Sequence, residues 1–257
     1  MWVIVLSPFF TVVINMNSIC QIEIIFLSPH RRLSGPDNQG VRRCGGDCAT
    51  WLVSPNFSRL CNKIYTMDIV DLYCGIGGFS AGAMEAGCKP IAGYDCDDSA
   101  LRLWSGNTGG KGVVTTLWKG RIRLPAPRAN LHIHLSPPCT ELSSAKRGAS
   151  RKAIDDGKDG IRQALQVVLD YKYTSWSLEN VSTPAVRELL DEFALRAPNL
   201  IAYTTVDAAD LGAPTTRRRL IAGPPAMIER LRETPVHRVS VADAFAAAGV
   251  NLPAQAH

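Results

Sequence analysis

Short apolar runs alternate with amphipathic stretches from residue 67 onward, and this alternation constrains the fold more than any other feature of the sequence. The runs IVDLY, PIAGY, LHIHL and SWSLENV have the length and composition of buried strands. Between them, DGIRQALQVVLDYK and PAVRELLDEFALRA show the periodicity of amphipathic helices. Strands that alternate with helices in this way predict a parallel sheet with helices on both faces. We therefore expect an α/β protein with a doubly wound, mostly parallel sheet.

The segments that flank this alternation differ from it. The first 27 residues are apolar. A secretory signal requires a positively charged residue before its apolar core, but no Lys or Arg stands there, and Pro8 interrupts the core. Polar residues such as Glu23 interrupt the run before it reaches the roughly 20 apolar residues of a membrane span. We therefore predict no membrane association. The expected organisation is an N-terminal extension outside the fold or disordered (1–66), a folded domain (67–225) and a C-terminal tail (226–257).

Composition excludes some classes of protein. The eight cysteines show neither a disulfide-framework spacing nor paired C-x-x-C zinc-ligand spacing, so we expect no metal site. Free thiols predict an intracellular, reducing compartment. The net charge of +5 is compatible with a polyanionic partner but is also typical of many enzymes.

A glycine turn follows the first predicted strand of the domain. Gly75, Gly77 and Gly78 open the next helix, so backbone N–H groups and a helix N-terminus can face a ligand. The spacing G-x-G-G differs from the dinucleotide fingerprint. Asp95 stands 20 positions after Gly75 at the end of the second predicted strand, where a carboxylate can accept both ribose hydroxyls of an adenosine-containing cofactor. The alternatives are a tight structural turn and a solvated aspartate.

Two prolines stand directly before Cys139, where an apolar run gives way to a polar one. Pro137 and Pro138 each fix a φ angle and lack an N–H donor, so they hold the thiol in one orientation. The turn follows a predicted strand, and ligands of open α/β sheets bind at that edge. This favours a nucleophile over a buried structural cysteine. The basic stretch 143–160 then predicts a lid that contacts phosphates, with an ordinary solvated loop as the alternative.

Charged residues mark two further strand ends. Glu179 and Asn180 stand at the end of the strand SLENV, where the Glu179 carboxylate can bond the endocyclic nitrogen of a base, or serve only as a helix cap. The segment TTRRRLIAG enters a short strand, and alternation sends Arg217 and Arg219 to one face and Arg218 to the other. A basic edge strand is the alternative interpretation.

Together and in this order, these segments resemble the cytosine-5 DNA methyltransferases. DLYCGIGGFSAG resembles their S-adenosylmethionine loop, YDCD the ribose-binding acidic turn, SPPCTELS the nucleophile loop, LENV the glutamate strand and PTTRRRLIAG the arginine segment. The resemblance covers residues 67 to 225 and implies a Rossmann-like, S-adenosylmethionine-dependent methyltransferase fold. It also implies DNA as the partner, with a flipped-out cytosine as the target.

The resemblance assigns a role to each catalytic candidate. It implies that Cys139 attacks ring carbon 6 as a thiolate, and that Glu179 holds the protonated ring nitrogen 3. Arg219 would bond the carbonyl oxygen at carbon 2, and Arg217 would support the same edge. Cofactor contacts fall on Tyr73, Ile76, Gly78, Asp95, Cys96 and Pro138, beside the turn glycines Gly75 and Gly77.

The sequence also departs from the family pattern. Thr140 and Thr215 replace glutamines. An aspartate for the adenine amino group is expected in the segment VVTTLWKGR, which offers only threonines in its place. About 30 residues follow RRRLIAG, where the family continues into a target-recognition domain. The alternatives are therefore a methyltransferase completed by a separate target-recognition subunit, an inactive remnant that acts as a binding or regulatory module, and a tRNA cytosine-5 methyltransferase.

Overall fold

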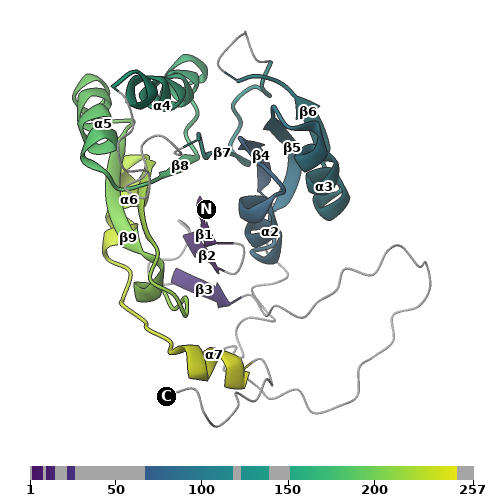
Figure 1. Ribbon diagram of the computed structural model, residues 1–257, viewed down its shortest axis with the longest axis vertical. Coiled ribbons are helices and arrows are strands. Elements are labelled where there is room, and N and C mark those ends of the chain that lie inside the picture. Colours follow the sequence, from purple (N-terminus) through teal and green to yellow (C-terminus); the bar gives the residue numbers. More distant parts are fainter. Residues whose placement is uncertain are drawn as a thin grey trace.

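The computed structural model describes residues 2–7, 10–14, 22–26, 67–117, 123–138 and 151–247. Its centre is a seven-stranded sheet in the order β6-β5-β4-β7-β8-β10-β9 (Figure 1). Strands β4 to β8 run parallel, and β10 is antiparallel to both of its neighbours. This confirms the predicted doubly wound, mostly parallel sheet. The strands are β4 (Asp68–Leu72), β5 (Lys89–Asp95), β6 (Lys111–Val114), β7 (Leu131–Leu135), β8 (Trp176–Asn180), β9 (Ala202–Asp207) and β10 (Arg218–Gly223).

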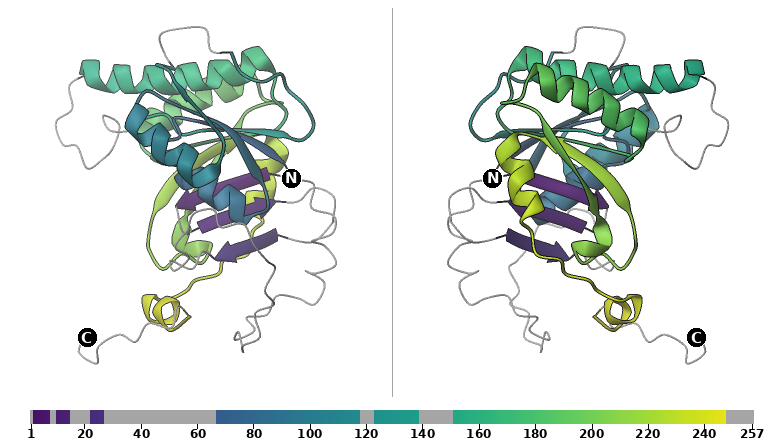
Figure 2. Two further views of the ribbon diagram at one scale, coloured as in Figure 1. Left: turned by 90° about the vertical axis from the view of Figure 1, so that its right-hand side faces the viewer. Right: turned by 90° about the vertical axis from the view of Figure 1, so that its left-hand side faces the viewer.

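Helices cover both faces of this sheet (Figure 2). Helices α4 and α5 lie on one face, and α2, α3 and α6 lie on the other. A further helix, α7, extends away from the sheet near the C-terminus (Figure 1). None of the helices in the described ranges combines the length and apolarity of a bilayer span. The helices are α2 (Gly78–Glu85), α3 (Asp98–Thr108), α4 (Arg151–Tyr171), α5 (Pro184–Arg196), α6 (Pro225–Arg232) and α7 (Val241–Ala247), with a 3₁₀ turn at Ala208–Asp210.

Local signals in the sequence set the helix ends. The side chain of Asp97 accepts the N–H groups of Ser99 and Ala100 and so caps α3 at its N-terminus. The same helix ends at Gly109, whose φ of 70° is the left-handed conformation common after a helix. Pro184 opens α5, where its missing N–H costs no hydrogen bond. The N-terminal ends of α3 and α5 therefore follow β5 and β8 at the sheet edge that carries the candidate site.

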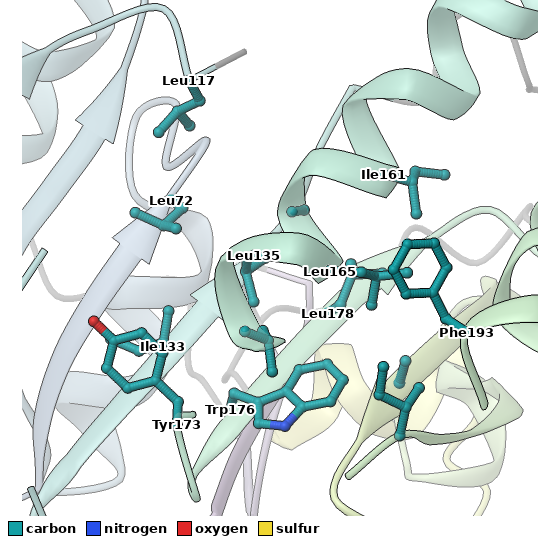
Figure 3. Packing of buried hydrophobic residues seen from close by; sticks show 14 of the residues in the cluster. Leu72, Leu117, Ile133, Leu135, Ile161, Leu165, Tyr173, Trp176, Leu178 and Phe193 are labelled. Carbon is teal, nitrogen blue, oxygen red and sulfur yellow. The ribbon is translucent and has the colours of Figure 1, made fainter. Parts of the chain in front are cut away.

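The main core lies between the sheet and helices α4 and α5 (Figure 3). Alternate residues of β7 face this core, and Trp176 and Leu178 of β8 lie beside them. Every residue of β7 is buried, as expected for a central parallel strand covered on both faces. The largest fully buried side chains are Trp104, Trp176, Tyr173, Ile69, Leu72, Leu131, Ile133 and Leu135.

The opposite face of the same strands is polar. His132 bonds Ser175 and Ser177 through its two ring nitrogens, each at 2.9 Å, and His134 Nδ1 bonds Ser177 at 2.9 Å. The ring of Phe79 in α2 stacks on His134 with a centroid separation of 3.6 Å. Burial lowers the pKa of both imidazoles, that of His132 to about 3. Both histidines are therefore neutral at physiological pH and act as packed hydrogen-bonding groups.

The N-terminal segment contributes a second, three-stranded antiparallel sheet. It consists of β1 (Trp2–Ser7), β2 (Phe10–Ile14) and β3 (Ile22–Phe26). Strand β1 lies against α2 and β8, and β2 lies against α2 and α6 (Figure 2). The hypothesis that residues 1–66 form an extension outside the fold stays a prediction, as do the boundaries at 67 and 225.

The structure corrects the expected lid in part. Residues 151–160 belong to helix α4 rather than to a loop, and the remainder of the predicted lid, 143–150, lies outside the described residues. The apolar stripe beyond Ile161 forms the helix, and adding turns to an existing helix is easier than nucleating one. Lys158 also pairs with Glu188 of α5 at 3.4 Å. Strand β6 and helix α6 were not expected from the sequence.

Candidate active site at the carboxyl edge of the sheet

The glycine turn after β4 has the backbone conformation that its glycines permit. Gly75 and Gly77 have φ values of 50° and 100°, which strain any residue with a Cβ atom. The N–H of Gly75 donates to Asp95 Oδ2 at 2.8 Å, so the turn is fixed to the end of β5. A Cβ atom on Gly75 would meet nothing within 4 Å. The turn therefore borders open space on the side where a ligand can approach.

A pocket opens beside this turn. Residues from β4, β5, β6 and β7 or the turns directly after them line it: Tyr73, Asp95, Cys96, Thr115, Leu117, Ser136 and Pro138. Four of these, namely Tyr73, Asp95, Cys96 and Pro138, are candidates that the sequence places at the cofactor. Ile76 is 61% exposed, and with Gly77 and Gly78 it follows Gly75 into helix α2.

The pocket residues fit an adenosine-containing group. The Asp95 carboxylate accepts one backbone N–H on each oxygen, from Gly75 at 2.8 Å and from Asp97 at 3.0 Å. An ionised carboxylate has about four acceptor positions, so both oxygens keep capacity for ribose hydroxyls. Leu117 and Pro138 supply apolar walls that suit an aromatic base. Thr115 stands where the expected adenine-binding aspartate is absent, and its N–H donates to the Asp95 carbonyl at 2.8 Å.

Trp104 of α3 supports the turn from beneath. Its ring lies so close to Gly77 and Gly93 that a Cβ on either would approach within 2.9 Å and 2.5 Å. Its Nε1–H donates to Ser80 Oγ at 2.9 Å, and Ser80 donates to Asp71 Oδ2 at 2.6 Å. All three side chains are fully buried. This chain of hydrogen bonds joins α3, α2 and β4 directly under the glycine turn.

Asp71 is the titratable end of this chain. Burial raises its pKa to about 7, although the bonds from Ser80 and Trp104 oppose the rise. Its second oxygen, Oδ1, has no hydrogen-bond partner among the described residues. An unpaired buried carboxylate oxygen is unfavourable, which is the physical reason for the raised pKa.

A second group forms at the ends of β8 and β10. Glu179 Oε1 lies 2.6 Å from Arg219 Nε and 3.9 Å from Arg217 Nη2. The Glu179 and Arg219 side chains are 19% and 20% exposed, whereas that of Arg217 is 43% exposed. Burial raises the pKa of Glu179, and the positive charges of Arg219 and Arg217 counteract that rise. Arg217 and Arg219 therefore meet the same carboxylate, as strand alternation predicts.

The proline turn lies between the two groups. Ser136 and Pro138 line the pocket, and the carbonyl of Pro137 accepts a hydrogen bond from Asn180, the neighbour of Glu179. Cys139, the candidate nucleophile, directly follows this turn and lies outside the described residues. The fold thus brings the pocket, the proline turn and the Glu179–Arg219 pair to one edge of the sheet.

Sequence reasoning missed several residues of this edge. Thr115 and Leu117 follow β6, which was not expected as a strand. The sequence indicates their segment only as one that lacks the expected adenine-binding aspartate, so neither residue was assigned to the pocket. Ser136 carried a usable signal, because it stands at the strand end before the two prolines. Asn180 was placed at the correct strand end without a role. The part played by Trp104 depends on long-range packing against glycines, which no local pattern reveals.

Comparisons with known proteins agree with this arrangement. The model of the C-5 cytosine-specific DNA methylase family matches residues 67–223, which is more than half of the 257-residue chain. The type II methyltransferase M.XorII of Xanthomonas oryzae pv. oryzae is 27% identical over 168 residues, which cover 59% of this chain and 39% of that protein. The chain therefore spans well under half the length of this curated relative.

Solved structures with a similar arrangement include two methyltransferases. A prophage-encoded protein of E. coli, described as a DNA modification methyltransferase, is 21% identical, with a TM-score of 0.49 and coverage of 74% of this chain and 56% of that chain. The Dnmt2 methyltransferase of S. pombe is 17% identical, with a TM-score of 0.43 and coverage of 61% and 48%. On the family match, this chain belongs to the C-5 cytosine-specific DNA methylases.

Proposed function

We propose that this chain transfers a methyl group to carbon 5 of cytosine in DNA through a covalent adduct with Cys139. The observation that carries the proposal is the Glu179–Arg219 pair, whose atoms lie 2.6 Å apart at the same sheet edge as the proline turn and the pocket. A carboxylate and a guanidinium side by side match the N3 and O2 edge of a cytosine ring. The family match over residues 67–223 supports the same reaction.

The covalent step needs a thiolate and an activated ring. Cys139 loses its proton, and its sulfur forms a bond to carbon 6 of a cytosine flipped out of the duplex. The electrons of the carbon 5–carbon 6 double bond then make carbon 5 nucleophilic. After methylation, a base removes the carbon 5 proton, the double bond re-forms, and the carbon–sulfur bond breaks. The thiolate is thereby regenerated.

Glu179 and Arg219 stabilise the charge that develops on the ring during attack. The raised pKa of Glu179 favours a carboxyl that shares a proton with ring nitrogen 3. Arg219 uses Nε for Glu179 and Nη1 for the carbonyl of Arg218 at 2.8 Å, so other N–H donors of its guanidinium remain for the carbonyl oxygen at carbon 2. Arg217 adds positive charge on the same side. Such stabilisation is worth most when the donors are fixed before the reaction.

The pocket would hold S-adenosylmethionine, which supplies the methyl group when bound. Asp95 would accept the ribose hydroxyls, and Leu117 and Pro138, which line the pocket, would flank the adenine ring. The open space at Gly75 leaves room for the part of the ligand that approaches the backbone. Tyr73, Ile76 and Cys96 border the same site, and the N-terminus of α2 begins after Gly77 and Gly78.

Transfer of labelled methyl groups tests the proposal. The protein is incubated with labelled S-adenosylmethionine and either duplex DNA or tRNA, with Cys139→Ser as the matched variant. The proposal expects label in DNA and none with Cys139→Ser. Label in tRNA alone would identify a tRNA methyltransferase. No label in either polymer, from protein that binds S-adenosylmethionine, would identify a non-enzymatic module.

A further inference from the structure

The turn that precedes Cys139 lacks the backbone N–H donors that usually hold a chain at the end of a strand. Strand β7 pairs with β4 and β8 up to Leu135, and Ser136 continues the pairing through its N–H to the Leu72 carbonyl at 3.2 Å. Pro137 and Pro138 then follow, and neither has an N–H to donate. The backbone of Pro137 and Pro138 can therefore be held only through its carbonyl groups or by its contacts. A donor from elsewhere must supply each such bond.

Asn180 supplies the donor. Its Nδ2 lies 3.0 Å from the carbonyl oxygen of Pro137, and its side chain is 1% exposed. Its Oδ1 accepts the N–H of Val181 at 2.9 Å. This second bond fixes the orientation of the amide, because a flipped amide would face an N–H with its NH₂ and a carbonyl with its oxygen. The Asn180 amide is thus buried in a single orientation, with its NH₂ group directed at the Pro137 carbonyl.

The register of the sheet explains why this residue reaches the turn. Leu135 of β7 pairs with Leu178 of β8, so Pro137 and Asn180 are each two residues further along neighbouring strands. The Asn180 side chain therefore supplies a hydrogen bond from β8 to a turn that has no N–H of its own to donate. Glu179 immediately precedes Asn180 and pairs with Arg219. One dipeptide therefore fixes the carboxylate and the turn together.

We propose that Asn180 is a positioning residue that sets the direction in which the Pro137–Pro138 turn presents Cys139 to the base held by Glu179. The inference rests on the proposed function for the role of the thiol. It assigns to Asn180 an effect on the chemical step and not on cofactor binding, because its bond is to Pro137 and its side chain is not among those that line the pocket.

Three variants of the full chain test the inference. Asn180→Ala removes the donor and should lower kcat for methylation of duplex DNA by on the order of 100-fold, since misplacement of a reacting group by about 1 Å has that cost. The Kd for S-adenosylmethionine should stay within about threefold. Ser182→Ala is the matched control, because it removes a tie between the same loop and Thr205 (2.8 Å) and should leave kcat within about threefold of wild type.

Asn180→Asp adds a pH readout that a merely structural role would not give. A buried carboxyl without a positive partner has a raised pKa, so it gains a proton near neutrality and can then donate to the Pro137 carbonyl. Its kcat relative to wild type should rise at least fivefold between pH 8 and pH 6, whereas the ratio for Asn180→Ala should stay flat. A flat ratio for both variants, or Asn180→Ala with nearly wild-type kcat, would overturn the inference.

Hydrogen exchange distinguishes failure of this inference from failure of the proposed function. Backbone amides of residues 139–142 should exchange faster in Asn180→Ala than in wild type or Ser182→Ala, whether or not the chain methylates DNA. Faster exchange in a chain without activity would keep the anchor and reject the proposed function. Unchanged exchange would reject the anchor, and thermal unfolding of each variant checks that the fold is intact.

Discussion

The two halves of the candidate site are built in different ways. The pocket half, around Asp95 and the glycine turn, is held by backbone hydrogen bonds and by Trp104 packed beneath it. The catalytic half, around Glu179 and Arg219, is held by side-chain ion pairs between two strands. The difference indicates that the pocket half depends on buried packing and that the catalytic half depends on charge. Changes in charge and changes in packing should therefore affect binding, chemistry and stability separately.

A rise in pH should lower the free energy of unfolding through the buried Asp71 beneath the pocket. This is the largest of the effects that we expect. The unfolded Asp71 ionises near its ordinary pKa of 3.8, whereas the folded group keeps its proton until about pH 7. The folded state therefore loses stability as pH rises from about 4 to 7, by up to about 4 kcal/mol at 1.4 kcal/mol per pKa unit. Denaturant unfolding at pH 5 and pH 8 measures the part of this loss that falls above pH 5, about 3 kcal/mol at 1.4 kcal/mol per pKa unit. Asp71→Asn should flatten the dependence, and a slope equal to that of wild type would contradict the assignment to Asp71.

Loss of the carboxylate should break the catalytic half and leave the pocket half intact. Glu179→Gln removes the partner of Arg219 and the group proposed to share a proton with the base. We expect kcat to fall by about 100-fold or more, with the affinity for S-adenosylmethionine within about threefold of wild type. Arg218→Ala is the control, because Arg218 is exposed on the other side of the strand. Equal losses for both variants would place the effect outside the Glu179 pair.

Loss of the Asp95 carboxylate should weaken the pocket half, and its main effect should be on the binding of S-adenosylmethionine. Asp95→Asn replaces an oxygen that accepts hydrogen bonds with an NH₂ group and weakens the proposed contact with the ribose hydroxyls. We expect a Kd for S-adenosylmethionine higher by about 10- to 30-fold, in keeping with about 1.5–3 kcal/mol for a hydrogen bond to a charged group. Isothermal titration calorimetry measures it. An unchanged Kd would remove Asp95 from the proposed cofactor site.

A change at Trp104 should have a smaller effect and should test whether packing stabilises the pocket half. Trp104→Phe keeps an aromatic ring but removes the donor to Ser80. We expect a loss of about 1–2 kcal/mol in the free energy of unfolding, because Ser80 and Asp71 lose part of their hydrogen-bond chain. Methyl transfer at saturating S-adenosylmethionine should change less than threefold. A selective loss of kcat with unchanged stability would show that Trp104 acts on the chemistry instead.

Local patterns predicted the parts of the site that depend on chain order. The glycine turn, Asp95 and Glu179 each end or follow a strand whose apolar run was evident, so parallel pairing placed them at one edge. Thr115 and Leu117 could not be found, because the short strand before them has a weak pattern and is paired on one side only. The sequence did not indicate the start of α4, because its first turns are polar. These turns are helical because they extend the helix that the apolar stripe forms. The bond from Asn180 to Pro137 depends on sheet register, which a single sequence does not specify.

The central claim is that Cys139 forms a covalent bond to cytosine at the edge where Glu179 and Arg219 meet. Duplex DNA that contains 5-fluorocytosine blocks the final elimination, because fluorine replaces the proton that must leave from carbon 5. With S-adenosylmethionine present, mass spectrometry of the digested complex should find the modified base on the peptide that contains Cys139. An adduct on another residue, or none from protein that binds both DNA and S-adenosylmethionine, would contradict the account.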